Sequence, residues 1–148
     1  MPTKRTQVWA AQDALLQALQ AQTWDEPIKP VLGTPARMEA DQVWVSGEVD
    51  QWSAQYRTSG LGTKDEVFTL RVHCLATRLG GGYTELRDRL AALGANVEDV
   101  LQDDFTLGGT VMLATIASQQ VEEAMLDDGR RRQGLLTFFI ECTAHVAG

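Results

Sequence analysis

Few of the residues that build reactive sites occur in this chain of 148 residues, which has two cysteines and two histidines. Cys74 and Cys142 each fall on the apolar alternation of a predicted strand. Neither has a second cysteine or histidine at the spacing of a zinc site. We therefore expect both to be small buried core residues with reduced thiols.

Long hydrophobic runs are also missing. No apolar stretch approaches the roughly 20 residues needed to cross a bilayer. Lys4 and Arg5 stand near the N-terminus, but the following segment carries Gln and Asp instead of an apolar core, unlike a signal peptide. We expect a protein that is made and folded in a cytoplasm and has no membrane partner.

Positive charge is scarce, with 13 basic against 20 acidic residues and a net charge of −7. Proteins that hold nucleic acid gain most of their affinity by neutralising phosphates, so this balance argues against such a role. It is compatible with DNA that passes without specific binding. Apolar residues make up 44% of the chain, and its length favours one domain spanning 1–148.

Motifs for catalysis or cofactor binding are not found. The hydrolase motif G-x-S-x-G is absent, and the histidines lie on different predicted strands. The loop Arg57 to Asp65 contains GLGTKD, which lacks the spacing of a phosphate-binding loop. The acidic pairs Glu122-Glu123 and Asp127-Asp128 are adjacent on a strand, so their side chains point to opposite faces. The sequence predicts no catalytic residue, no cofactor and no metal site.

The strongest structural signal lies in the last quarter, Gly108 to Val146. It predicts two β-strands joined by a turn at Asp128-Gly129. In that register, the numbers of two residues that face each other across the hairpin sum to 257. The pairs then form an apolar row and a mixed row: Val121 with Leu136, Ala117 with Ile140, Thr115 with Cys142, Leu113 with Ala144 and Val111 with Val146, against Gln120 with Thr137, Ile116 with Glu141 and Met112 with His145. We expect the tip of this hairpin to project past the helices as a charged, two-stranded arm.

Other elements follow from periodicity and from glycine and proline. Apolar spacing predicts an amphipathic helix over Thr6 to Gln22, with Gln12 on its polar face. A second helix, on a leucine stripe, begins near Tyr83. The remaining predictions are a short edge strand at Ile28 to Leu32, a long strand at Gln42 to Tyr56 with a bend near Asp50-Gln51, a strand at Glu66 to Thr77, a helix end at Gly94 and a further helical turn over Asn96 to Gln102. Trp44 and Trp52 are expected on the less buried side of their strand.

The predicted fold class is α+β. It has a mainly antiparallel sheet of four to five strands, two helices packed on one face, and two long β-hairpins. This order of elements resembles the tail terminator (tail completion) proteins of long-tailed bacteriophages. Four segments carry the resemblance: V-W-A-A-Q-D-A-L-L-Q-A-L, E-V-F-T-L-R-V-H-C, G-G-Y-T-E-L-R-D-R-L and L-L-T-F-F-I-E-C-T-A-H-V.

The resemblance implies a structural, non-enzymatic virion protein without a cofactor, assembled in the host cytoplasm and located in the tail or neck. Family members form a ring, commonly a hexamer, that caps the tail tube and ends its polymerisation. The partners implied are copies of the chain, the tail tube protein and the head-tail connector protein, with genome DNA passing through.

Projecting hairpins with opposite charges suit head-to-tail contacts around a closed ring. The candidate contact residues are Glu122, Glu123, Asp127, Arg130, Arg131, Arg132, Arg57, Lys64 and Trp52. Two alternatives stay open. One is another neck or head completion protein. The other is a small cytosolic α+β ligand-binding module or enzyme that uses the face bearing Arg71, His73 and His145.

Overall fold

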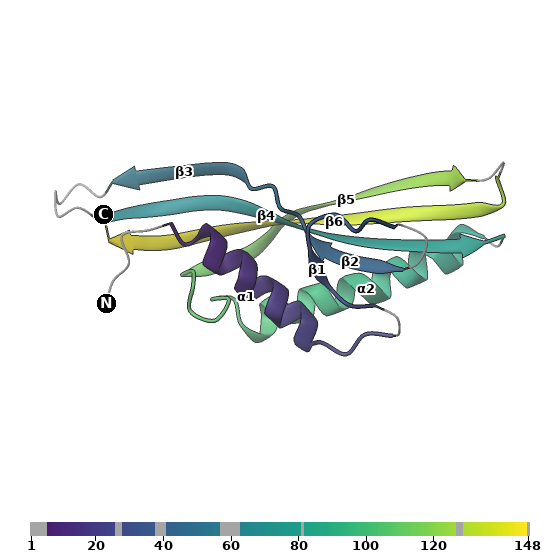
Figure 1. The fold of residues 1–148 in the computed structure, drawn as a ribbon, viewed down its shortest axis with the longest axis horizontal. Coiled ribbons are helices and arrows are strands. Elements are labelled where there is room, and N and C mark those ends of the chain that lie inside the picture. Colours follow the sequence, from purple (N-terminus) through teal and green to yellow (C-terminus); the bar gives the residue numbers. More distant parts are fainter. Residues whose placement is uncertain are drawn as a thin grey trace.

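The structure, a computed structural model, describes residues 6–25, 28–37, 41–56, 63–80, 82–126 and 129–147. These residues form two α-helices and a six-stranded sheet (Figure 1). In chain order the elements are α1 (Val8–Ala21), β1 (Val31–Leu32), β2 (Gln42–Val45), β3 (Asp50–Tyr56), β4 (Thr63–Leu79), α2 (Tyr83–Asp103), β5 (Leu113–Leu126) and β6 (Arg131–Ala147).

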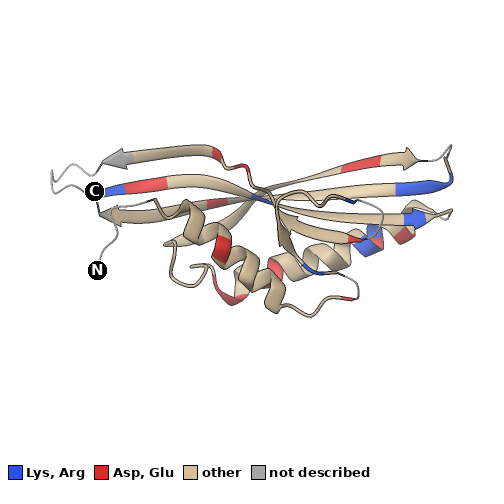
Figure 2. Ribbon diagram, viewed as in Figure 1, with Lys and Arg blue, Asp and Glu red and all other residues tan. Residues whose placement is uncertain are grey.

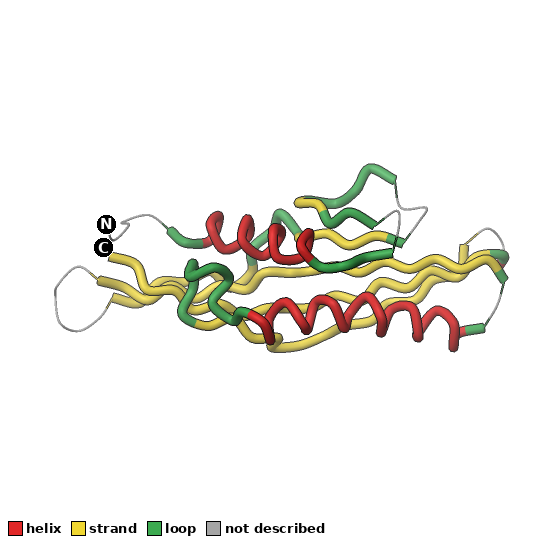
Figure 3. Tube along the Cα trace, turned by 90° about the horizontal axis from the view of Figure 1, so that it is seen from below, coloured by secondary structure: helices red, strands yellow, loops and turns green. Residues whose placement is uncertain are grey.

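The sheet has the strand order β1-β2-β4-β6-β5, and β3 continues along the same side of β4 as β2. All strand pairs are antiparallel except β1 with β2. The α+β class and the mostly antiparallel sheet are as predicted. The predicted count of four to five strands is wrong, because one predicted strand divides in two. Both helices lie on one face of the sheet, as Figure 3 shows.

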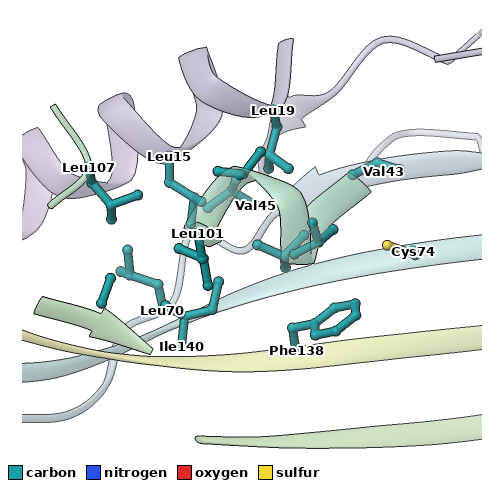
Figure 4. Packing of buried hydrophobic residues seen from close by; sticks show 14 of the residues in the cluster. Leu15, Leu19, Val43, Val45, Leu70, Cys74, Leu101, Leu107, Phe138 and Ile140 are labelled. Atoms are coloured by element: carbon teal, nitrogen blue, oxygen red, sulfur yellow. The ribbon is translucent and has the colours of Figure 1, made fainter. Parts of the chain in front are cut away.

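The two central strands, β4 and β6, pair over their full length of 17 residues each, from Thr63 opposite Ala147 to Leu79 opposite Arg131. Their even-numbered residues face the helices and form the sheet side of the core, as Leu70, Cys74, Phe138 and Ile140 do in Figure 4. The alternation of apolar and polar residues along each strand predicts which side chains face the helices, since successive side chains of a strand point to opposite faces.

The β5–β6 hairpin follows the predicted register only in its outer half. From Leu126 to Ser118 the pairs sum to 257, with Val121 opposite Leu136 and Gln120 opposite Thr137. A bulge at Ala117 then shifts the pairing by one residue, so the predicted pairs nearer the start of β5 are wrong. The bulge turns Ala114 and Ile116 toward the core in place of Leu113 and Thr115.

A break divides the predicted strand over Gln42 to Tyr56 into β2 and β3. The predicted bend at Asp50-Gln51 is present, where Gln51 has φ 50° and the register with β4 shifts. The expectation that Trp44 is less buried is wrong. Trp44 is 3% exposed and its ring lies 5.1 Å from the ring of His73, between centroids.

Helix α1 is attached to the sheet by buried polar contacts. Gln12, predicted to face water or a polar neighbour, is 4% exposed, and its Nε2 donates to the carbonyl of Ser46 (3.2 Å). At the start of the helix, the buried Glu66 carboxylate accepts the N–H of Gln7 (2.9 Å) and the hydroxyl of Thr6 (2.5 Å). A carboxylate at this place pairs otherwise unsatisfied N–H groups and suits the helix dipole.

Helix α2 continues without interruption to Asp103, so the predicted helix end at Gly94 is wrong. A Cβ at Gly94 would lie 3.0 Å from side-chain atoms of both Leu136 and Phe138. A Cβ at Gly134 on β6 would lie 2.7 Å from Leu90 Cδ1. These glycines allow the helix to approach the sheet closely, which is a packing role and not a turn.

The predicted two-stranded arm is also wrong. Strand β4 pairs with β6 as far as Arg131, which makes the tip three-stranded. The first turn of α2 reaches it, because the guanidinium of Arg132 lies 4.0 Å from the ring centroid of Tyr83. The tip is therefore part of the main sheet.

Candidate interaction surfaces

Strand β5 forms one edge of the sheet, and no other described strand pairs with its outer side. It is 14 residues long and nearly all of it is exposed, with Val121 and Met125 at 54% and 55%. Its beginning is covered, where the Ala114 N–H donates to the carbonyl of Phe105 (2.8 Å), and near its end Glu123 pairs with Arg87 of α2 (3.7 Å). Such an edge offers free backbone groups to another chain, and soluble proteins commonly block it.

A groove of about 440 Å³ lies where the C-terminal end of α2 meets the first half of β5. Its apolar lining comes from Leu101, Phe105, Leu113, Ala114 and Ile116. Leu101 and Ala114 are buried, whereas Phe105 and Leu113 are 52% and 46% exposed. The groove thus has a hydrophobic floor and exposed hydrophobic walls.

The connection between α2 and β5 is held in one conformation by local hydrogen bonds. The Asp104 carboxylate accepts the hydroxyl of Thr106 (2.5 Å), and the N–H groups of Thr106 (2.9 Å) and Gly108 (2.8 Å). These bonds, that of the Thr106 hydroxyl foremost, lower the pKa of Asp104. Leu107, with φ 47°, is buried at 2% exposure. These contacts therefore hold Phe105 in place at the groove in the single chain, without a binding partner.

An exposed aromatic pair stands at the opposite edge of the sheet. Trp9 of α1 and Trp52 of β3 are 53% and 45% exposed. Their rings meet edge to face, with centroids 5.5 Å apart. The indole N–H of Trp52 donates to Glu66 (2.8 Å), the same carboxylate that holds the start of α1. The pair is fixed by a buried group even though its rings face solvent.

Charged residues gather at the tip near the N-terminal end of α2, as Figure 2 shows. Among the candidate contact residues there, Glu123 pairs with Arg87 (3.7 Å) and Arg132 stacks on Tyr83. Arg130 is exposed, and its carbonyl accepts the N–H of Gly80 (2.8 Å). Glu122 is also exposed, on the face away from the helices, while Arg131 is partly buried.

The remaining candidate contact residues do not join this cluster. Lys64 and Trp52 lie at the other end of the sheet, since Lys64 precedes Arg78, the partner of Arg132, by fourteen residues along β4. At ~3.3 Å per residue, Lys64 lies roughly 46 Å from the level of Arg132, and Trp52, which lies opposite Phe68, is roughly 33 Å from that level. Arg57 and Asp127 lie outside the described residues, as does most of the loop that contains Arg57.

The two histidines do not share a site. His73 bonds Thr137 through Nδ1 (2.8 Å), and His145 pairs with Asp65 (3.2 Å). Asp65 and His73 are eight residues apart on β4, which is roughly 27 Å. Burial lowers the pKa of His73 first, and the nearby Arg71 cation lowers it further, while Glu122 and Glu48 act in the opposite direction.

Arg71 lies beside a hollow of about 310 Å³ on the face that the helices leave open. Its guanidinium donates two hydrogen bonds to Asp50 (2.5 and 2.6 Å) and lies 5.5 Å from the ring centroid of Phe139. Asp50 therefore occupies the hydrogen-bonding groups that an anionic ligand would use. Neither histidine lines this hollow.

The other groups with shifted pKa values are also parts of the folded structure, either buried in the core or held in ion pairs. Burial raises the pKa of the Cys74 and Cys142 thiols to about 12, so both stay protonated at neutral pH. Burial would raise the pKa of Asp41, but hydrogen bonds from Arg78 and Arg89 outweigh that effect and lower it. These contacts tie the segment before β2 to β4 and α2.

Within the described residues, no three His, Cys, Asp or Glu side chains are grouped as metal ligands. No helix there is long and apolar enough to span a membrane. No protein-family model matches the chain, and no curated protein is significantly similar to it.

The sequence predicted Trp52 as a contact residue, and the structure places it at an exposed position. The sequence did not single out Trp9, Phe105 or Leu113, which are exposed as well. Trp9 lies beside the apolar stripe of α1, and a large aromatic off the buried face of a helix is the signal that identifies it. Phe105 and Leu113 depend on the path of the α2–β5 connection and on the bulge in β5. No local pattern encodes either feature.

Proposed function

We propose that this chain is a structural virion protein of a long-tailed bacteriophage. In this proposal, copies form a ring that caps the tail tube, ends its polymerisation and joins it to the head connector. The observation that carries the proposal is the open edge of β5, a 14-residue strand with exposed apolar residues. A protein built to remain alone would shield such an edge, whereas a subunit of a ring covers it with its neighbour.

The arrangement of charge and the order of elements support the same proposal. Helix, short edge strand, hairpin, helix and long hairpin follow one another as the resemblance to tail terminator proteins implies. The two open sides of the sheet, β5 on one and β1 with β3 on the other, differ in length and side chains. Unlike edges favour head-to-tail contacts, which generate rings when the rotation closes. A net charge of −7 would repel DNA phosphates and let a genome slide past.

The direct test is the mass of the particle in solution. Size-exclusion chromatography with light scattering should show a ring of several copies at tens of micromolar, or after the purified tail tube protein is added. Negative-stain images should then show annular particles. A strict monomer in both samples would contradict the proposal.

Binding partners separate a tail terminator from another neck protein. Tubes polymerised from the tail tube protein should stop growing when this chain is added in amounts matching the number of tube ends. A head completion protein would bind the connector and leave tube growth unchanged. Replacing the exposed Arg130 with Glu should weaken assembly, while a ligand-binding module would keep its ligand after that change.

A further inference from the structure

Five of the exposed aromatic and aliphatic side chains lie at one level of the sheet, on its two opposite edges. Trp9 and Trp52 stand at the β3 edge, and Phe105, Met112 and Leu113 stand at the β5 edge. All five are between 45% and 53% exposed. Large exposed apolar patches commonly mark surfaces that bind other proteins.

Strand pairing shows that the two groups lie at the same height. Gln51 and Trp52 together oppose Phe68, because Asp50 pairs with Thr69 and Ser53 with Val67. Phe68 pairs with Cys142, and Cys142 pairs with Ala114, which lines the groove beside β5. Figure 3 shows α1 along one side of the sheet and α2 with the α2–β5 connection along the other.

We propose that the Trp9 and Trp52 side chains of one copy dock into the groove between α2 and β5 of the next copy. This inference rests on the proposed function, since it identifies the contact that would close the ring. Because both surfaces lie at one height, successive copies need no displacement along the strands. A head-to-tail contact without such a displacement closes into a ring when the rotation between successive copies also closes.

The chemistry of the two surfaces is complementary. A groove of about 440 Å³ with walls from Phe105 and Leu113 offers an apolar surface to an indole ring. Glu98, Gln102 and Gln119 also line the groove and provide oxygen acceptors. The structure gives no hydrogen-bond partner for the indole N–H of Trp9 among the described residues, whereas Trp52 donates to Glu66. Tryptophan combines large apolar area with one donor, which suits a binding site of this kind.

Cysteine cross-linking tests the contact directly. Within one copy, Trp52 lies on β3, and Phe105 lies against β5, three strand spacings or about 14 Å from β3. A disulfide needs Cα atoms within about 7 Å, so Trp52→Cys and Phe105→Cys cannot bond within one chain. Mixing the two single variants under mild oxidation should give covalent dimers, and the double variant should give a ladder that ends at the ring.

The controls distinguish this contact from other modes of assembly. Each single variant alone should remain uncross-linked, because a head-to-tail contact never brings two copies of one position together. Self-cross-linking of either single variant would point to a two-fold contact and overturn the inference. Leu79→Cys, at the far end of β4 and 79% exposed, should cross-link with neither. The native thiols, Cys74 and Cys142, are buried and do not compete.

Charge substitution supplies a second measurement that does not depend on disulfide chemistry. Phe105→Glu should weaken ring formation by about 30-fold or more, as expected when a central interface residue is lost. Rings that form normally with Phe105→Glu and without the mixed cross-link would overturn this contact but keep the proposed function. If no assembly occurs even with tail tube protein, both proposals fail.

Discussion

The two faces of the sheet are held by different forces. On the face under the helices, the even-numbered residues of β4 from Phe68 to Ala76 and of β6 from Phe138 to Val146 are all 0% exposed. On the open face, side chains are joined in specific pairs, Arg71 to Asp50 and His73 to Thr137. The stability of the first face depends on close packing, so it changes when a substitution changes side-chain volume. The second depends on hydrogen bonds and charge, which respond to pH and salt.

Neighbouring phenylalanines on β6 give the sharpest comparison. Phe138 faces the helices at 0% exposure, while Phe139 faces the open side under Arg71. Phe138→Ala should lower the free energy of unfolding by about 3–5 kcal/mol because it leaves a cavity in the core. Phe139→Ala should cost about 1 kcal/mol, since its ring loses mainly surface packing and a cation–π contact. Urea unfolding of the two variants measures both losses in free energy. Equal losses would contradict the difference between the two faces of the sheet.

Adding volume to the packed face should also be costly. Gly134→Ala places a Cβ 2.7 Å from Leu90 Cδ1, so we expect a loss of about 1–3 kcal/mol in the free energy of unfolding. Gly47→Ala is the matched control, because nothing lies within 4 Å of the added atom. Thermal unfolding should place the Gly134 variant clearly below the wild type and the Gly47 variant close to it. A neutral Gly134 variant would show that α2 can move off the sheet at little cost.

On the open face, removing the Arg71 cation should have a smaller effect on the free energy of unfolding, and this effect should depend on salt. Arg71→Met leaves Asp50 without its guanidinium partner, and we expect a loss of about 1–2 kcal/mol at low salt. Both side chains are nearly 30% exposed, so 1 M NaCl should reduce the difference from the wild type. Arg87→Met removes a looser pair whose arginine is 70% exposed, and it should change stability by no more than about 0.5 kcal/mol. A loss at Arg71 that salt leaves unchanged would indicate packing instead.

The smallest expected effect is the titration of His73. Its pKa in the folded chain lies below the ordinary value of 6.5, so the unfolded chain binds the proton more readily. The resulting stability is fully present above pH 6.5 and is lost as pH falls through the folded pKa. Unfolding free energies measured from pH 7.5 to 5.5 should decline in the wild type and decline less in His73→Gln. A decline in His73→Gln as steep as in the wild type would contradict this assignment.

Much of this fold could be predicted from local patterns. The alternation in β4 and β6 identifies the residues that face the helices, and the spacing in α2 identifies its buried stripe. The hairpin register is correct from Leu126 to Ser118 because turn chemistry sets it over short distances. Of the candidate contact surfaces, the charged tip and Trp52 could be identified, but not the groove opposite Trp52.

The sequence by itself determined which residues alternate, which helices are amphipathic and how the strands of the final hairpin pair next to its turn, because each depends on neighbours in the chain. Only the tertiary structure decided the bulge at Ala117, the burial of Gln12 and Trp44, and the continuity of α2 through Gly94. Each of these is set by contacts with residues distant in sequence, such as Ser46, His73 and Phe138. Close packing couples such residues, so their conformations follow from the space left by the other elements.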